Sequence, residues 1–116
     1  MNVLFENARP SQPGYRDVDP VQVDAARGKT RIVDVREPAE FTGELGHIAE
    51  AELVPLATVE DAAKAWDREQ EIVLVCRSGN RSGRAAAALA AMGFKRPMNM
   101  VGGMLAWNDA KLAVER

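Results

Sequence analysis

The segment that decides the fold is Ile72-Val73-Leu74-Val75-Cys76-Arg77-Ser78-Gly79-Asn80-Arg81-Ser82. Its first four residues form a continuous apolar run of strand length, which is typical of the centre of a parallel sheet that is covered on both faces. Gly79 permits the unusual backbone angles that a tight loop requires. From Ser82 to Met92 the chain is rich in alanine and is expected to form a helix that ends at Gly93. The segment therefore predicts a strand, a short loop and a helix, with Cys76 directly after the strand.

Shorter elements are expected on either side of this segment. Strands are expected over residues 15–18, 31–35, 51–53 and 97–101, and helices over residues 20–27, 37–41, 58–66 and 104–112. Asp19-Pro20 is an N-cap residue followed by proline at the first helical position, and Thr58 to Asp61 has the pattern of a capping box. Because strands alternate with helices, the sequence predicts an α/β fold with a mainly parallel sheet and right-handed crossovers.

The length of the chain corresponds to one domain. It has 116 residues, of which 47% are hydrophobic and 28% charged, and these are the values of an ordinary globular protein. Residues 1–14 contain two prolines and a glycine and are expected to form a loosely held N-terminal arm. Residues 15–116 are expected to form the folded domain.

Charge and hydropathy exclude several classes of partner. The formal net charge of -2 argues against a nucleic-acid partner, which would call for a basic surface. No apolar run approaches the ~20 residues that span a bilayer, and the first residues lack a signal-peptide pattern, so no membrane association is expected. The single cysteine, Cys76, can form neither an internal disulfide nor a CxxC metal site. It is compatible with a reducing compartment, and the expected location is the cytoplasm.

The position of Cys76 favours chemistry over packing. Ligands of open α/β sheets bind at the carboxyl ends of the strands, and the start of the following helix attracts anions through its free N–H groups and its dipole. Arg77, Arg81 and Arg84 add positive charge, which favours the reactive thiolate over the thiol. The expected substrate-binding residues are Arg77, Ser78, Gly79, Asn80, Arg81 and Ser82. The alternative is that Cys76 packs as a small apolar residue beside solvated arginines.

The length of the loop separates two cysteine chemistries. Cysteine-dependent phosphatases use a Cys-x5-Arg loop whose arginine grips the phosphoryl group, whereas this chain has Cys-x4-Arg, with Ser82 at the position of that arginine. A loop that is one residue shorter encloses a smaller pocket, which favours a terminal sulfur atom over a phosphate. Asp34 and Glu37 could approach the loop in space, but neither has an obvious claim to protonate a leaving alcohol. A phosphatase or an arsenate reductase is therefore the less favoured reading.

Three segments in the same order resemble the single-domain rhodaneses. The first is the stretch from Asp34 to Phe41 (Asp-Val-Arg-Glu-Pro-Ala-Glu-Phe), with Gly46-His47-Ile48 and Val54-Pro55-Leu56 after it; the second is Cys76 to Ser82; the third is Gly93-Phe94 with Gly102-Gly103-Met104-Leu105-Ala106-Trp107. The resemblance extends from about Tyr15 to Leu112. One departure is Glu50, which stands where family members commonly have a glycine and affects a local turn.

The resemblance implies a single rhodanese-like domain with a sheet of about five strands, flanked by helices on both faces. It also implies a thiosulfate sulfurtransferase in which Cys76 takes sulfur from a small anionic donor such as thiosulfate and holds it as a persulfide. An external thiol, cyanide or a protein acceptor then removes the sulfur. Arg77 favours thiosulfate over mercaptopyruvate. No cofactor and no metal are expected.

Several other residues are expected to support the site. Asp34 and Arg36 flank the end of a strand and are interpreted as an ion pair or a loop brace, and Trp107 is expected to pack near the mouth of the site. His47, the only histidine, is interpreted as a hydrogen-bonded turn residue rather than a base. Two functions stay open: an enzyme with steady turnover, and a sulfur carrier that passes the Cys76 persulfide to a protein partner. The presence of Cys76 argues against a non-catalytic rhodanese-like module.

Overall fold

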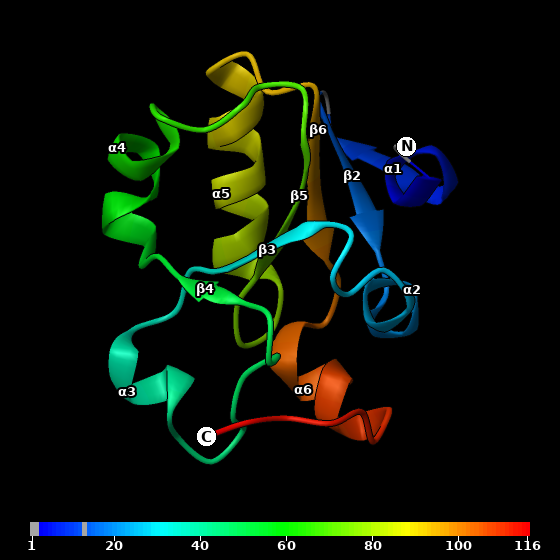
Figure 1. Cartoon of the computed structure of the whole chain (residues 1–116), viewed down its shortest axis with the longest axis vertical. Coiled ribbons are helices and arrows are strands. Elements are labelled where there is room, and N and C mark those ends of the chain that lie inside the picture. The colour runs from blue at the N-terminus through cyan, green and yellow to red at the C-terminus, as the bar shows by residue number, and fades with distance from the viewer. Residues whose placement is uncertain (1–2, 13) are drawn as a thin grey trace.

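A six-stranded sheet forms the middle layer of the structure, a computed structural model that describes residues 3–12 and 14–116 (Figure 1). The strands are β1 (Arg9–Gln12), β2 (Tyr15–Val18), β3 (Arg31–Asp34), β4 (Glu52–Leu53), β5 (Glu71–Val75) and β6 (Arg96–Met100). Their order across the sheet is β1-β2-β6-β5-β3-β4. Only the β1–β2 pair is antiparallel among these strands. The expected α/β class is confirmed, with one strand more than the five expected.

Helices cover both faces of this sheet. They are α1 (Val3–Asn7), α2 (Pro20–Ala25), α3 (Pro38–Phe41), α4 (Val59–Ala63), α5 (Asn80–Ala91) and α6 (Gly103–Asp109), and a 3-10 turn, η1 (Leu56–Thr58), precedes α4. In Figure 1, α4 and α5 lie on one side of the sheet and α1 and α2 on the other. None of the helices in residues 3–12 and 14–116 combines the length and the apolar character that a membrane crossing requires.

The central strand β5 faces two separate hydrophobic cores. All five of its residues are buried, as the continuous apolar run predicts. Because successive side chains of a strand point to opposite faces, Val73 and Val75 join the core beneath α1, α2 and α6. Ile72 and Leu74 join the core beneath α4 and α5, and Cys76 belongs to the same cluster. The sheet register therefore directs Cys76 toward α5.

The starts of α2 and α4 differ from each other. The expected cap of α2 is confirmed, because Asp19 Oδ1 accepts from the Gln22 N–H at 2.8 Å and Gln22 Oε1 accepts from the Asp19 N–H at 2.9 Å. The capping box expected at Thr58 is wrong. Thr58 ends the turn η1 in a helical conformation, whereas an N-cap residue is extended, and its hydroxyl donates to the Pro55 carbonyl at 3.0 Å.

The amino-terminal segment is ordered where we expected a loose arm. Residues 3–12 contain α1 and the edge strand β1, and Leu4 and Ala8 are buried in the core. The Phe5 N–H donates to Glu71 Oε2 at 2.8 Å, which ties α1 to the start of β5. Pro10 is accommodated because proline is tolerated on an edge strand. Residues 1, 2 and 13 of the expected arm lie outside the described residues.

Candidate active site

Cys76 lies directly after β5, beneath a loop whose outer residues face solvent. We call residues 76–81 the cysteine loop. Cys76 is 1% exposed, whereas Arg77, Ser78 and Asn80 are exposed. Helix α5 begins at Asn80, two residues before the expected start. The thiol is therefore at the predicted end of the sheet, but one layer below the surface.

The sulfur of Cys76 is held by polar hydrogen-bond donors. The Gly79 N–H donates to Sγ at 3.0 Å, and the Ser82 hydroxyl lies 3.3 Å from Sγ. Gly79 has a φ of 105°, a left-handed conformation that favours glycine and that turns its N–H toward the sulfur. The geometry therefore brings together the cysteine, the glycine and the serine that the sequence singled out. Their part in substrate binding stays a prediction.

These contacts set the ionisation of the thiol. Burial by itself raises the pKa of the Cys76 thiol, because a charged sulfur is disfavoured away from water. Hydrogen bonds from the Ser82 hydroxyl and from the N–H groups of Ser82, Gly79 and Ser78 outweigh burial, and the pKa lies below its ordinary value of 9.0. The local structure therefore favours the thiolate.

The start of α6 supports the cysteine loop from below. The Met104 N–H donates to the Cys76 carbonyl at 2.9 Å, and the Leu105 N–H donates to the Arg77 carbonyl at 3.0 Å. Gly103 has a φ of 56°, and a Cβ atom at this position would overlap the Cys76 carbonyl oxygen and the Arg77 peptide. From the sequence, Gly102-Gly103 was noted only as part of the third segment that resembles the rhodaneses. Two adjacent glycines between the last strand and a helix could have indicated that the backbone here packs closely against another segment.

Arg81 points to a carboxylate that sequence reasoning missed. Its Nη1 and Nη2 atoms donate to Glu40 Oε1 and Oε2 at 2.7 and 2.8 Å. These hydrogen bonds lower the pKa of Glu40 to about 2, against the opposing effect of burial, and the Glu37 N–H contributes to the lowering. Part of the positive charge expected at the cysteine loop is therefore compensated by α3. Arg77 and Arg84 are exposed.

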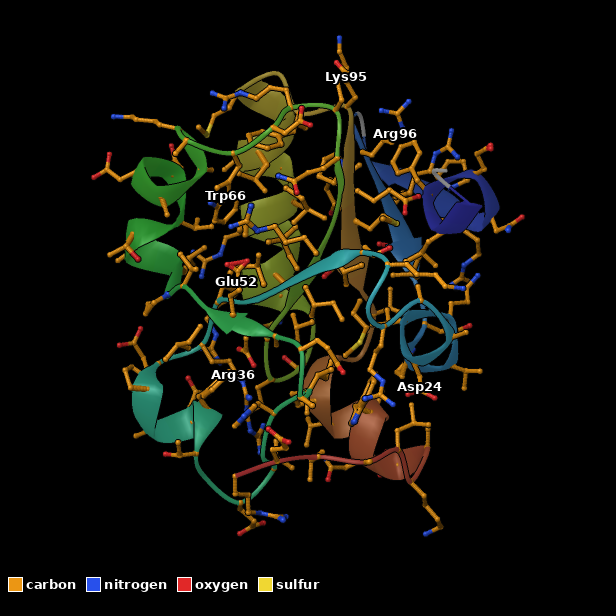
Figure 2. All side chains as sticks on the ribbon, in the orientation of Figure 1. Asp24, Arg36, Glu52, Trp66, Lys95 and Arg96 are labelled. Atoms are coloured by element: carbon orange, nitrogen blue, oxygen red, sulfur yellow. The ribbon has the colours of Figure 1, made fainter. Side chains whose placement is uncertain are left out.

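Asp34 and Arg36 form the expected ion pair and loop brace. Both are buried, and Arg36 Nη2 lies 2.8 Å from Asp34 Oδ2. Arg36 also donates to the carbonyls of Glu40 at 3.2 Å and Gly46 at 2.7 Å. Figure 2 shows the Arg36 side chain beside α3, inside the curve of the chain that leads toward β4. The pair therefore fixes the segment that carries Glu40.

His47 is a turn residue, as expected. Its Nδ1 lies 2.8 Å from the Phe41 carbonyl oxygen, and its ring stacks on Phe41 with a centroid distance of 3.7 Å. The backbones of His47 and Glu115 exchange two hydrogen bonds, at 2.7 and 2.8 Å. The Arg116 guanidinium donates to the Glu44 carbonyl at 2.7 Å. The carboxyl-terminal residues are thereby fastened to the turn after α3.

Trp107 does not lie where we expected it. It is fully buried in the core beneath α6, whereas Cys76 belongs to the core on the other face of the sheet. Its indole N–H donates to the Ala113 carbonyl at 3.0 Å. The apolar side of α6 turns toward the larger core, so Trp107 supports the carboxyl-terminal segment rather than the mouth of the site.

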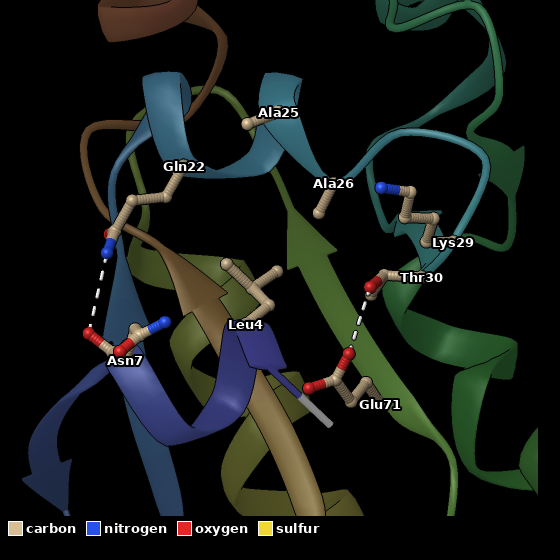
Figure 3. Close-up of a pocket in the computed structure, with 8 residues that line it drawn as sticks. All are labelled: Leu4, Asn7, Gln22, Ala25, Ala26, Lys29, Thr30 and Glu71. Atoms are coloured by element: carbon tan, nitrogen blue, oxygen red, sulfur yellow. Dashed lines mark hydrogen bonds between the residues drawn. The ribbon is translucent and has the colours of Figure 1, made fainter. Parts of the chain in front are cut away.

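A cavity of about 530 Å³ lies away from Cys76 (Figure 3). Its lining includes Leu4 on α1, Gln22 on α2 and Glu71 at the amino end of β5. Cys76 follows the carboxyl end of the same strand. The cavity is therefore at the opposite end of the sheet from the cysteine loop.

The fold and the cysteine loop together define the class of protein. The family described as the Rhodanese-like domain matches residues 19–110, and the chain belongs to this family. A rhodanese-like domain protein from Staphylococcus aureus, known from a crystal structure, is similar in fold, with a TM-score of 0.73 and 28% identity. That match covers 86% of this chain and 98% of the other.

Two curated relatives indicate sulfur chemistry in the family. The thiosulfate sulfurtransferase GlpE of Pseudomonas fluorescens is 31% identical over 96 residues, which cover 82% of this chain and 86% of that protein. The putative sulfur carrier protein YrkF of Bacillus subtilis is 41% identical over 76 residues, which cover 66% of this chain and 40% of that protein. Several curated relatives are longer, and the chain spans about half of their length.

Proposed function

We propose that this chain is a sulfurtransferase that moves sulfane sulfur from thiosulfate, or a related donor, to a thiophilic acceptor through a Cys76 persulfide. The observation that carries the proposal is the sulfur of Cys76, held by main-chain N–H groups and a hydroxyl that lower its pKa. A thiolate is the form of cysteine that attacks sulfur. The same donors suit the negative outer sulfur of a persulfide.

The two half-reactions balance without a cofactor. In the first, the Cys76 thiolate attacks the outer sulfur of thiosulfate, and the sulfur–sulfur bond of the donor breaks. Its electron pair leaves with sulfite, and Cys76 carries a persulfide. In the second, an acceptor thiolate or cyanide attacks the outer sulfur, and the Cys76 thiolate leaves. The sequence contains one cysteine, so the acceptor comes from outside the chain.

The cations around the loop favour a small anionic donor. Arg77, which follows Cys76 in the chain, and Arg84 on α5 are exposed, and positive charge attracts anions such as thiosulfate. Arg81 is engaged in two hydrogen bonds with Glu40, so it is not poised to grip a phosphoryl group. Together with the short loop, this argues for sulfur transfer over phosphate hydrolysis.

Intact mass spectrometry after incubation with thiosulfate tests the proposal. Wild-type protein is expected to gain the mass of one sulfur atom, and Cys76→Ser is expected to gain none while keeping its circular dichroism spectrum. Cyanide should then return the wild-type protein to its starting mass. An unmodified wild-type protein, or equal labelling of Cys76→Ser, would contradict transfer through this residue.

A sulfur carrier is the second candidate, and the burial of Cys76 favours it. A thiol that is 1% exposed shelters a bound persulfide from solvent thiols, and one relative is named a putative sulfur carrier protein. Steady-state turnover with thiosulfate and cyanide separates the two functions. Continuous turnover supports the enzyme. One rapid loading step followed by slow discharge, which speeds up only with a protein acceptor, supports the carrier.

A further inference from the structure

The Ser82 hydroxyl has one hydrogen and two neighbouring acceptors. Its oxygen lies 2.6 Å from Asn99 Oδ1 and 3.3 Å from Cys76 Sγ. A hydroxyl donates one hydrogen bond at a time, although it can accept others. When Ser82 donates to Asn99, the sulfur receives no hydrogen from Ser82. The ionisation of Cys76 therefore depends on whether residue 99 accepts the hydrogen of the Ser82 hydroxyl or donates a hydrogen to its oxygen.

Asn99 can present either a donor or an acceptor to Ser82. It lies on β6 with 8% of its surface exposed, in register with Leu74 on β5. Its Oδ1 accepts from Ser82, and its Nδ2 has no hydrogen bond within the part of the chain that the structure describes. Half a turn about the Cβ–Cγ bond exchanges the two atoms. Because Nδ2 has no partner to lose, this rotation gives up only the bond to Ser82.

We propose that Asn99 is a positioning residue for Cys76, whose side-chain amide turns with the state of the sulfur and thereby directs the single Ser82 hydrogen. With a thiol, the Cys76 S–H donates to Ser82 Oγ and Ser82 donates to Asn99 Oδ1. With a thiolate, the thiol proton has left to solvent, Asn99 Nδ2 donates to Ser82 Oγ, and the hydroxyl hydrogen goes to the sulfur. The hydroxyl hydrogen of Ser82 has an acceptor in both states.

This inference deepens the proposed function and rests on it, since sulfur transfer needs the thiolate. Other titratable and charged groups lie on the elements around Cys76, Ser82 and Asn99, and they must stay constant in a test. They are Tyr15 and Asp17 on β2, Asp34 on β3, Glu40 on α3, Arg77 in the cysteine loop, and Arg81 and Arg84 on α5. Asp17 is in register with Asn99, and its Oδ1 is buried without a hydrogen-bond donor among the described residues. Residue 17 is an aspartate in every variant below.

The test is the pH dependence of Cys76 alkylation by iodoacetamide in a double-mutant cycle. The protein has one cysteine, so the reaction reports one site. Asn99→Asp supplies only acceptors and keeps the Ser82 hydrogen on residue 99. We expect Ser82→Ala, and separately Asn99→Asp, to raise the apparent pKa of Cys76 by about one unit. In the Ser82→Ala background, Asn99→Asp is expected to add less than half of that shift, because only its charge remains.

Equal shifts from Asn99→Asp in both backgrounds would mean that residue 99 acts by charge alone and would overturn the proposal. Asn99→Leu offers no acceptor, so the Ser82 hydroxyl should still donate to the Cys76 sulfur. Ser82→Ala should therefore still raise the apparent pKa of Cys76 in the Asn99→Leu background. If Asn99→Asp fails to fold, NMR of the wild-type Asn99 side-chain amide gives the same answer. Its resonances should titrate with Cys76 and stay still in Cys76→Ser; resonances that ignore the wild-type titration would overturn the proposal.

Failure of this inference and failure of the proposed function are distinguishable. Alkylation measures ionisation and needs no sulfur donor. If the wild-type protein gains no sulfur from any donor but shows the expected coupling between Ser82 and Asn99, only the proposed function is contradicted. If it gains sulfur without that coupling, only the role of Asn99 is contradicted.

Discussion

At Cys76, burial and hydrogen bonding act in opposite directions on the thiol. Burial disfavours the thiolate, and hydrogen bonds from Ser82 and from the loop amides favour it and prevail. The proposed function requires such a balance, because sulfur transfer would need the site both to shelter a persulfide and to regenerate a thiolate. The neighbouring Arg81 contributes less than its charge suggests, because Glu40 holds it.

The Glu40–Arg81 pair makes stability depend on pH. The pKa of Glu40 is about 2 in the folded protein, below the ordinary value of 4.5, so its contribution is complete above pH 4.5 and is lost as the pH falls toward 2. The pair is about a third exposed, so Glu40→Gln should lower the free energy of unfolding at neutral pH by about 1 kcal/mol. Near pH 2, where about half of the Glu40 carboxyl groups are protonated, the difference should be much smaller.

Urea unfolding of wild type and Glu40→Gln at both pH values measures this difference. Glu60→Gln removes the same charge from the exposed side of α4 and corrects for the change in net charge. A difference between wild type and Glu40→Gln that is equal at neutral pH and near pH 2 would show that the ion pair does not stabilise the fold.

At the residue scale, sequence reasoning found what is contiguous and missed what is distant. Cys76, Gly79 and Ser82 lie close together in the sequence, so their grouping could be predicted from the sequence alone. Glu40 lies 41 positions before Arg81, and only the fold brings the two together. Trp107 was expected near the mouth of the site, but the side of α6 on which it lies depends on how the helix packs.

At the scale of elements, α6 and the cysteine loop act as one unit. The N–H groups of Met104 and Leu105 satisfy the carbonyls of Cys76 and Arg77, while the Gly79 N–H donates to the sulfur. This contact requires the backbone of α6 to approach without a side chain at Gly103. The loop is therefore shaped as much by the end of the chain as by its own sequence.

Gly103→Ala tests this close approach. A methyl group would overlap the loop backbone, so we expect a loss of at least about 2 kcal/mol in the free energy of unfolding and a rise in the apparent pKa of Cys76. Gly28→Ala is the matched control, since Gly28 also has a positive φ, of 82°, but has no atom within 4 Å of the added carbon. Urea unfolding and alkylation measure both effects. Equal effects of the two substitutions would refute a specific contact.

Element types were predictable where the pattern was strong. The apolar run predicted β5, since full burial leaves a continuous signal in the sequence. The alanines predicted α5, since alanine has the highest helix propensity. The start of α4 was mistaken because Thr58 has the residue type of a cap but not its extended backbone. Backbone conformation at such a turn depends on neighbours that the local sequence does not reveal.

At the scale of the whole molecule, the sheet divides the apolar residues into two cores. The larger cluster includes Leu4 and Ala8, which belong to the segment that we expected to be loose. Prolines and a glycine in residues 1–14 led to that expectation. The pairing of β1 with β2 is a tertiary feature, and an antiparallel edge strand leaves too weak a pattern in four residues to be recognised.

Leu4→Ala tests whether the amino-terminal segment belongs to the folded unit. Leu4 is 8% exposed, and its truncation should lower the free energy of unfolding by about 2 kcal/mol. Val21→Ala is the control, because Val21 is 63% exposed and should change the free energy by less than about 0.5 kcal/mol. Urea unfolding measures both variants. Indistinguishable midpoints would restore the loose arm.

The fastening of Glu115 and Arg116 to the turn at residues 44–47 has a practical consequence. A dye attached at residue 116 would be held close to α3, because the backbone of Glu115 is hydrogen-bonded to His47. Glu40 on α3 in turn binds Arg81 of the cysteine loop. The emission of the dye could then follow events at that loop without any alteration of the loop itself.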